Sequence, residues 1–330
     1  MSAPLTKKDF VSDQEVRWCP GCGDYAILAA IQKTMPELGI PKEKIVFVSG
    51  IGCSSRFPYY MNTYGFHTIH GRAPAIATGL AAARPDLSVW VITGDGDGLS
   101  IGGNHLIHAI RRNVNLNILL FNNQIYGLTK GQYSPTSTPG TKSKSTPYGS
   151  LDAPFSATSV ALGAGATFVA RTYDKDAKHM GDVFRRAYEH KGTSFVEIYQ
   201  NCVIFNDAVF EHTIGKDTKA DNVVFLKHGE KLTFGKESNK AIAFENLSPT
   251  VTENLDAAIV HDERNAGPGY AFLLSQLRNP EFPEPMGVFR DIEKPAYEAE
   301  MQRQENEITE RLGKGDLQKL LRSGDTWEIK

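Results

Sequence analysis

One stretch of the sequence restricts the fold more than any other: an apolar segment that runs into a glycine-rich turn. Residues 89–106 are VWVITGDGDGLSIGGNHL. The segment begins as a buried strand, passes through a glycine loop and continues with the spacing of a helix. This order is typical of phosphate-binding turns in α/β proteins, where main-chain N–H groups at a helix N-terminus hold the anion. Here, however, the loop carries two carboxylates, Asp95 and Asp97, which would repel a phosphate.

Segments on both sides of this turn continue an alternation of strands and helices. Apolar runs bounded by Gly or Pro predict strands, and apolar residues at helical spacing predict helices. Strands that alternate with helices predict a doubly wound α/β fold, with a mostly parallel sheet covered on both faces. The predicted strands are 44–49, 87–93, 117–121, 166–171 and 194–199, and the predicted helices are 24–35, 73–84, 100–112, 156–162 and 176–190.

The regular pattern stops about two thirds of the way along the chain. We therefore divide the chain into an α/β domain, residues 1–207, and a C-terminal extension, residues 208–330. Within the extension, the sequence of residues 222–235 predicts a hairpin that turns at its central glycine. Residues 295–321 are charged and helical in composition, and we expect them to be solvated or to contact a neighbouring subunit.

The composition excludes several classes of protein. The chain has 330 residues, with 36 basic and 38 acidic side chains and a formal net charge of −2. This balance provides no general attraction to nucleic acid or to an anionic membrane surface. No segment is long and apolar enough to span a membrane, and the N-terminus does not resemble a secretory signal. We therefore expect a cytoplasmic protein without nucleic-acid or membrane partners.

Three interpretations of the acidic glycine loop compete. A dinucleotide-binding turn fits poorly, because such turns leave the diphosphate to main-chain N–H groups and place their acidic residue further along the chain. A structural alternative is that the aspartates cap the following helix. In the third interpretation, a divalent cation between Asp95 and a diphosphate turns repulsion into attraction. Mg²⁺ suits this role, because it is bound by few carboxylates together with phosphate oxygens.

The metal-bridge interpretation requires further oxygen ligands near Asp95. Asn123 follows the next predicted strand, at the start of a loop, residues 122–154, whose length favours a functional role. The carboxyl ends of neighbouring parallel strands meet at the edge where open α/β sheets bind ligands. The amide oxygen of Asn123 and the main-chain carbonyl of Ile125 would complete the protein's share of a Mg²⁺ shell.

The four cysteines indicate a second metal centre. Cys19 and Cys22 form a CPGC pair, whereas Cys53 and Cys202 each follow a separate predicted strand. In a reducing compartment these thiols favour zinc or an iron–sulfur cluster over disulfides. A structural zinc ribbon normally has two close pairs, whereas four dispersed thiolates suit a [4Fe–4S] cluster. Zinc, or ordinary burial of the two single cysteines, is the alternative.

The motifs taken together resemble one enzyme family. GDGD followed by NN is similar to the thiamine diphosphate signature, and CPGCG, GIGCS, HGRA, IGGNH and YGLTKGQYSPTS surround it. Residues 17–207, which contain these motifs, resemble the beta subunits of the 2-oxoacid:ferredoxin oxidoreductases. The resemblance implies oxidative decarboxylation of a 2-oxo acid with coenzyme A as acceptor, and transfer of the electrons through a [4Fe–4S] cluster to ferredoxin. It also implies Mg²⁺ on Asp95, Asn123 and the Ile125 carbonyl, and the cluster on Cys19, Cys22, Cys53 and Cys202.

Other residues are placed at the site by their positions in these motifs. His70 precedes a predicted helix, where it would contact cofactor phosphates or reacting groups. Arg56 and Lys130 stand beside the cofactor loops, and two cations would suit a substrate with a second carboxylate, which favours 2-oxoglutarate over pyruvate. The further residues predicted to bind cofactor are Gly52, Cys53, Ser54, Gly94, Gly96, Asp97, Gly127, Leu128 and Thr129.

One group that the thiamine diphosphate superfamily uses is missing from the predicted domain. In that superfamily a Glu from a second, pyrimidine-binding domain contacts the aminopyrimidine ring, and only one α/β domain is predicted here. We therefore expect a partner alpha subunit to supply this Glu, with two alpha–beta units pairing. The rival hypotheses are an NAD-linked dehydrogenase and a zinc-stabilised binding module.

Overall fold

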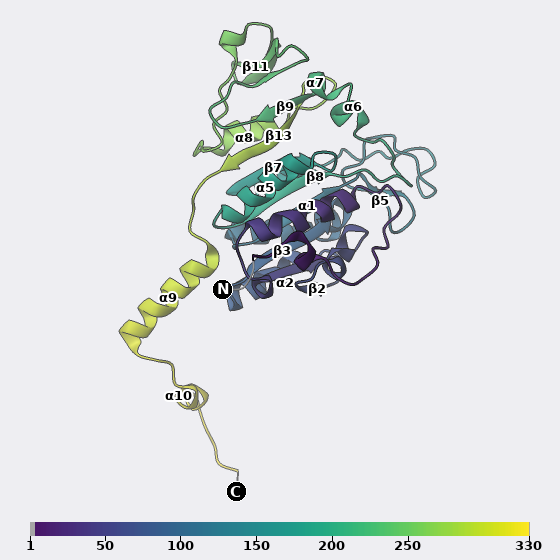
Figure 1. Ribbon diagram of the computed structural model, residues 1–330. Coiled ribbons are helices and arrows are strands. Elements are labelled where there is room, and N and C mark those ends of the chain that lie inside the picture. Colours follow the sequence, from purple (N-terminus) through teal and green to yellow (C-terminus); the bar gives the residue numbers. More distant parts are fainter. Residues whose placement is uncertain (1–3, 330) are drawn as a thin grey trace.

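An eight-stranded sheet forms the centre of the molecule (Figure 1). The computed structural model describes residues 4–329. The strand order is β2-β1-β3-β4-β8-β7-β13-β9; the first six strands are parallel, and β13 and β9 run in the opposite direction. The doubly wound α/β prediction is therefore confirmed. The strands are β1 (Ile45–Ser49), β2 (Tyr64–His67), β3 (Ser88–Gly94), β4 (Asn117–Asn122), β7 (Phe168–Tyr173), β8 (Ser194–Tyr199), β9 (Val223–Leu226) and β13 (Glu284–Asp291).

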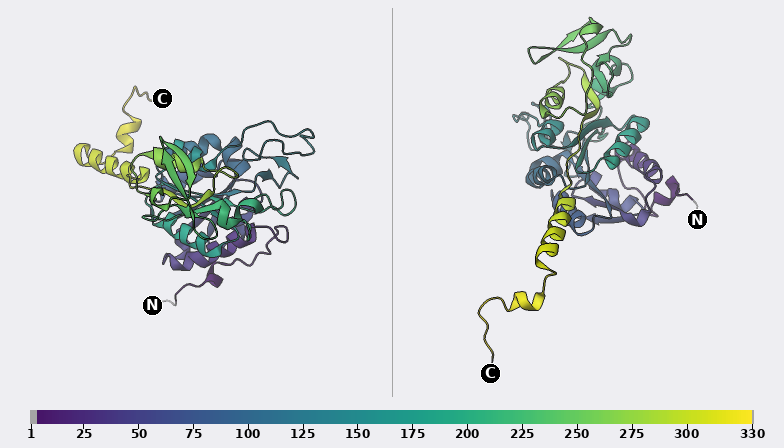
Figure 2. Two further views of the ribbon diagram at one scale, coloured as in Figure 1. Left: turned by 90° about the horizontal axis from the view of Figure 1, so that it is seen from above. Right: turned by 90° about the vertical axis from the view of Figure 1, so that its left-hand side faces the viewer.

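Helices cover both faces of this sheet (Figure 2). Successive side chains of a strand point to opposite faces, so a strand buried on both sides is apolar throughout. In β3, Val89 and Val91 lie in one core, whereas Trp90 and Ile92 lie in the other. The first core is covered by α2 (Ala73–Ala83), α3 (Gly103–Arg112), α4 (Ala157–Gly163) and α8 (Pro268–Ser275), and the second by α1 (Asp24–Glu37) and α5 (Ala177–Glu189).

The connections contain several short elements. The predicted loop 122–154 holds a two-residue ladder and one isolated bridge, between Ser143 and Thr146. The helix predicted from residue 100 begins at Gly103 and is preceded by a wide π-helical turn. The short elements in the first 150 residues are η1 (Lys7–Phe10), η2 (Lys42–Lys44), η3 (Ser54–Tyr60), η4 (Asp97–Ile101), β5 (Ile125–Tyr126) and β6 (Gln132–Tyr133).

The hairpin predicted for residues 222–235 is wrong. Its first strand, β9, joins the central sheet beside β13, and its second, β10 (Thr233–Phe234), pairs with β11 (Lys240–Glu245). Val224 and Leu226 are buried in the main core, and this long-range burial outweighs the local turn signal. The remaining elements of this region are α6 (Glu211–Ile214), α7 (Lys219–Asn222), β12 (Ser248–Thr252) and η5 (Leu255–Ala257).

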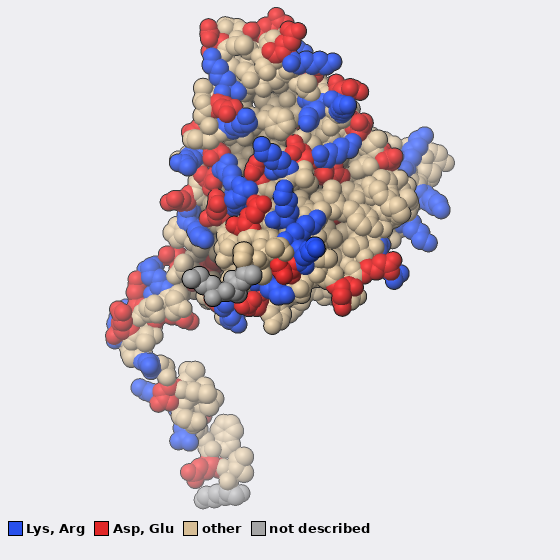
Figure 3. Space-filling model, in the orientation of Figure 1, with Lys and Arg blue, Asp and Glu red and all other residues tan. Residues whose placement is uncertain are grey.

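Two helices at the end of the chain project away from the body, as Figures 1 and 2 show. They are α9 (Tyr297–Leu312) and α10 (Leu317–Leu321), which confirms the helical prediction for this segment. Glu298 anchors the start of α9 by accepting hydrogen bonds from the main-chain N–H of Asn115. The face of the molecule in Figure 3 mixes basic and acidic side chains. No helix within residues 4–329 is long and apolar enough to cross a membrane.

Candidate active site

A cavity of ≈ 340 Å³ opens at the carboxyl edge of the parallel strands. Gly94 pairs with Phe121 in the β3–β4 register, so the acidic loop and Asn123 leave neighbouring strands at the same level. The sequence prediction that these loops meet is therefore consistent with the geometry. The cavity wall includes every residue predicted to bind cofactor: Gly52, Cys53, Ser54, His70, Gly94, Asp95, Gly96, Asp97, Asn123, Ile125, Gly127, Leu128 and Thr129.

Asp95 lines the cavity but is only 2 % exposed. Burial raises the pKa of its carboxyl to about 6, although hydrogen bonds from Ser134 and Thr136 oppose that rise in pKa. Both hydroxyls lie 2.5 Å from the Oδ2 atom. No Lys or Arg within residues 4–329 forms an ion pair with Asp95. A buried carboxylate is costly without a compensating cation, so this position suits a divalent metal ion.

Asp97 has a different environment from Asp95, although it lines the same cavity. Its Oδ1 atom accepts hydrogen bonds from the main-chain N–H groups of Gly71 at 2.7 Å and Ile51 at 3.1 Å. Its Oδ2 atom accepts one from the Thr93 hydroxyl at 2.8 Å. The hydrogen bonds of Asp97 therefore connect the loops of Ile51 and Gly71, at the edge of the cavity, with Thr93 on β3. The sequence motif alone did not indicate this role.

Asn123 lies between the two predicted metal centres. Its Oδ1 atom accepts a hydrogen bond from the Ile125 N–H at 3.2 Å, which leaves the oxygen a second lone pair for a ligand. Its Nδ2 atom donates to Gln200, and Gln200 in turn donates to the Cys22 sulfur at 3.2 Å. Gln200 was not predicted as a site residue; its only sequence signal is that it stands two residues before Cys202.

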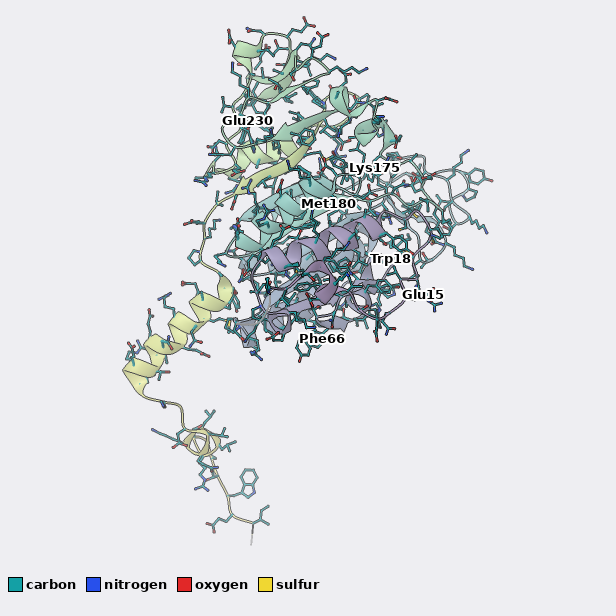
Figure 4. The ribbon with its side chains drawn as sticks, in the orientation of Figure 1. Glu15, Trp18, Phe66, Lys175, Met180 and Glu230 are labelled. Carbon is teal, nitrogen blue, oxygen red and sulfur yellow. The ribbon has the colours of Figure 1, made fainter. Side chains whose placement is uncertain are left out.

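The four cysteines line a second cavity, of ≈ 220 Å³. All four are free thiols, so the structure contains no disulfide between them. A Cβ atom at Gly127 would lie 3.6 Å from the sulfurs of both Cys53 and Cys202, so this glycine is next to both thiols. Trp18, labelled in Figure 4, packs its ring against Tyr25 at the start of α1 and donates to the Cys53 carbonyl.

The thiols in this cavity are poorly solvated. Burial and the neighbouring Asp24 carboxylate raise the pKa of Cys53 to about 12 and raise the pKa of Cys22 as well. A metal centre would favour the thiolate forms and offset this cost. Within residues 4–329, no three His, Cys, Asp or Glu side chains lie close enough together to bind a single metal ion. The cysteines are distributed around a cavity instead of converging on a point.

The two cavities share a wall formed by Cys53, Asn123, Gly127 and Leu128. The exposed residues Arg56 and Lys130 lie on the cysteine side of this wall, not in the cavity of Asp95. The Arg56 guanidinium donates to the Arg17 carbonyl, and neither cation pairs with an acidic side chain in the part of the chain that the structure describes. His70 is exposed at the rim of the Asp95 cavity.

Large apolar side chains are exposed on β2 and on segments before and after it. Strand β2 is an edge strand, and all four of its residues are exposed. The exposed apolar residues of this region are Tyr59, Tyr64, Phe66, Ile69 and Ile101, and Figure 4 labels Phe66. Ile101 lines the first cavity, and Ile69 directly precedes His70 at its rim; exposed apolar side chains beside a cavity are typical of an interaction surface.

The fold and the acidic glycine cavity define a thiamine diphosphate-binding α/β enzyme domain. A family model described as "Thiamine pyrophosphate enzyme, C-terminal TPP binding domain" matches residues 50–198. The chain is 54 % identical to the 2-oxoglutarate oxidoreductase subunit KorB of Mycobacterium tuberculosis, over 99 % of this chain and 89 % of that protein. The chain therefore belongs to the beta subunits of the 2-oxoacid:ferredoxin oxidoreductases.

Two further comparisons agree with this family. The beta subunit of 2-oxoacid:ferredoxin oxidoreductase 1 from Aeropyrum pernix is 47 % identical over 58 % of this chain and 60 % of its own length. A chain of the 2-oxoglutarate:ferredoxin oxidoreductase from Magnetococcus marinus matches with a TM-score of 0.78 and 36 % identity, over 98 % of this chain and 97 % of that one. That structure contains 2-oxoglutarate, coenzyme A and succinyl-CoA. Because the chain belongs to this family, the alternative hypotheses of an NAD-linked dehydrogenase and of a zinc-stabilised binding module are not supported.

Proposed function

We propose that this chain is the beta subunit of a 2-oxoglutarate:ferredoxin oxidoreductase. Together with its partners it would convert 2-oxoglutarate and coenzyme A to succinyl-CoA and CO₂ and pass the electrons to ferredoxin, in the cytoplasm. One observation carries the proposal: the cavity of Asp95 and Asn123 shares a wall with a cavity lined by four free cysteines. A decarboxylating centre and an electron acceptor could therefore sit side by side.

In this proposal, Asp95, Asn123 and the Ile125 carbonyl hold Mg²⁺, and the glycine loop holds the diphosphate. The buried carboxylate without a cationic side-chain partner supports this assignment. Bound thiamine diphosphate would supply a nucleophilic carbon and an electron sink for decarboxylation. The exposed His70 at the rim would contact the diphosphate or the reacting groups.

Cys19, Cys22, Cys53 and Cys202 hold the [4Fe–4S] cluster in this proposal. Four thiols that line a cavity fit a cluster better than a single ion, because a cluster carries its ligands on separate iron atoms. Gly127 lies beside two of these thiols, because a Cβ atom there would be 3.6 Å from both sulfurs, and it belongs to the wall shared with the Asp95 cavity.

Arg56 and Lys130 would attract the second carboxylate of the substrate. Both line the cysteine cavity, as Leu128 does, and neither forms an ion pair with an acidic side chain of the described residues. Leu128 lines both cavities, which suits contact with the methylene chain between the two carboxylates. The names of the relatives and the 2-oxoglutarate in the Magnetococcus structure support this choice; pyruvate or a broad range of 2-oxo acids is the alternative.

A partner alpha subunit would complete the site by supplying the pyrimidine-binding Glu. The exposed apolar residues Ile101, which lines the first cavity, and Ile69, next to His70, support a protein partner on that side. We also propose that residues 208–330 serve subunit contacts, because most of α9 and all of α10 are exposed. Two alpha–beta units would then pair.

The test is anaerobic co-purification of this chain with its alpha partner, followed by iron analysis and assays with a panel of 2-oxo acids. We expect about four iron atoms per chain and activity that depends on coenzyme A, thiamine diphosphate and Mg²⁺. Arg56→Gln and Lys130→Gln should raise the KM for 2-oxoglutarate more than the KM for 2-oxobutyrate. Lys144→Gln, an exposed lysine in the long loop, is the matched control. Equal effects on both substrates would contradict the 2-oxoglutarate assignment.

A further inference from the structure

The long loop after β4 places two buried hydroxyl groups against the Asp95 carboxylate. Ser134 and Thr136 are 2 % and 3 % exposed, and each hydroxyl lies 2.5 Å from Asp95 Oδ2. Each is therefore in position to donate to the same carboxylate oxygen, and hydrogen bonds to a charged acceptor are short and strong. Neither residue lines the cavity itself, so they reach any ligand only through Asp95.

The Thr136 hydroxyl also belongs to a buried chain of polar side chains. Its oxygen lies 2.9 Å from Asn122 Oδ1, so its single proton is shared between that acceptor and Asp95, and the Asn122 amide donates to Glu197 at 2.7 Å. Glu197 forms an ion pair with Arg171 at 2.8 Å, and Arg171 reaches the Pro285 carbonyl on β13. The chain therefore connects the carboxylate at the cavity with a strand of the C-terminal extension.

The loop is anchored by contacts that do not involve Asp95. The Ser137 hydroxyl accepts from the Ser134 N–H at 2.8 Å and donates to the Gln124 carbonyl at 2.5 Å. The Phe155 N–H donates to the Pro135 carbonyl at 2.9 Å. Removal of the Thr136 hydroxyl should therefore leave the loop in place, while it takes away the contacts of this hydroxyl with Asp95, Asn122 and the Ser134 hydroxyl.

We propose that Ser134 and Thr136 are positioning residues that fix the orientation of the Asp95 carboxylate toward the cavity, and thereby set the affinity for the Mg²⁺–diphosphate group. This inference rests on the proposed function and extends it to residues outside the cavity wall. A carboxylate ligand without fixed partners must lose its rotational freedom when the metal binds. Partners that orient metal ligands typically change metal affinity about 10–100-fold when they are removed.

The test compares Thr136→Val, Thr136→Ser and Thr138→Val in the complex with the partner subunit, after chelation of the metal and removal of the coenzyme. Thr138 is an exposed threonine in the same loop, so Thr138→Val makes the same chemical change away from Asp95. Calorimetric titration with Mg²⁺ at a fixed concentration of thiamine diphosphate gives the Kd for the metal. We expect Thr136→Val to raise this Kd at least tenfold, Thr136→Ser to stay within threefold of wild type, and Thr138→Val to have no effect.

The outcomes separate this inference from the function on which it rests. If the wild-type complex does not bind thiamine diphosphate in a Mg²⁺-dependent way, the proposed function fails. A second outcome is that the wild type binds Mg²⁺, that Asp95→Asn binds it weakly, and that Thr136→Val binds it like the wild type. This outcome would refute the positioning role and leave the proposed function intact. Should Thr136→Val not fold by circular dichroism, Ser134→Ala makes the same test, since it removes the other hydroxyl. A normal Mg²⁺ Kd for folded Ser134→Ala would then refute the inference.

Discussion

Gly71 is the position where one methyl group should damage the site most clearly. Its φ is +66°, in the left-handed region that residues with a side chain rarely adopt. A Cβ atom there would overlap the main-chain N and Cα of Gly102 and lie 2.9 Å from the Ile101 carbonyl carbon. Because these are main-chain atoms, Gly71→Ala cannot be accommodated by turning a side chain.

The size of the effect follows from two contributions. The left-handed conformation costs a residue with a side chain about 1–2 kcal/mol. The displaced turn would also lose the hydrogen bond from the Gly71 N–H to Asp97, and a hydrogen bond to a charged group contributes about 1.5–3 kcal/mol. We therefore expect Gly71→Ala to lower the free energy of unfolding by about 2.5–5 kcal/mol.

Urea unfolding of the purified chain measures this change, and Gly103→Ala is the matched control. Gly103 begins α3 in the same region, and a Cβ atom there would meet nothing within 4 Å. The free energy of unfolding of this control should stay within about 1 kcal/mol of the wild-type value. If Gly71→Ala lowers the free energy of unfolding by less than about 1 kcal/mol, or if both variants lower it equally, then contact between Gly71 and Gly102 does not limit stability. The same displacement should weaken binding of thiamine diphosphate, because His70 precedes this glycine at the cavity rim.

Three other perturbations have defined outcomes. Cys202→Ser should reduce bound iron and visible absorption, since the Cys202 sulfur borders the cavity at Gly127; unchanged iron content would contradict the cluster assignment. Burial lowers the pKa of His261, so its neutral form stabilises the fold above about pH 6.5, and that stability is lost as the pH falls through the lowered pKa. The free energy of unfolding should therefore fall less between pH 7.5 and pH 5 in His261→Gln than in wild type; equal slopes would exclude this role. Deletion of residues 313–330 should leave the Tm of the isolated chain within about 2 °C of the Tm of the full chain, because residues 313–329 are exposed. A larger drop in Tm in a thermal melt would show that the tail packs on the rest of the molecule.

Local patterns in the sequence were sufficient for most of the α/β framework. The apolar run 194–199 is β8 with the same bounds, and the residues around Asp95 form the predicted turn at the end of a buried strand. These segments could be predicted because burial on both faces of a sheet demands a largely apolar run, which is visible in the chain itself; the one charged residue of β8, Glu197, is paired with Arg171. The residues expected at the ligand edge were also predictable, because parallel strands bring their carboxyl ends together.

Contacts between distant segments were not predictable in the same way. The hairpin at 222–235 satisfied a local turn rule, but β9 is paired with β13, which lies about 60 residues further along the chain. Asp95 and Asp97 look equivalent in the motif, yet one accepts hydroxyl groups from the long loop and the other accepts main-chain N–H groups from the rim. No local pattern distinguishes them.

The sequence alone therefore determined the kind of sheet, the edge at which ligands would bind and the residue types available there, because strand periodicity and turn chemistry act over a few neighbouring residues. Only the tertiary structure decided that Gln200 links Asn123 to Cys22, and that Ser134 and Thr136 hold Asp95. Those partnerships depend on how separate loops cross the same edge of the sheet, and that arrangement is set by the packing of the whole core.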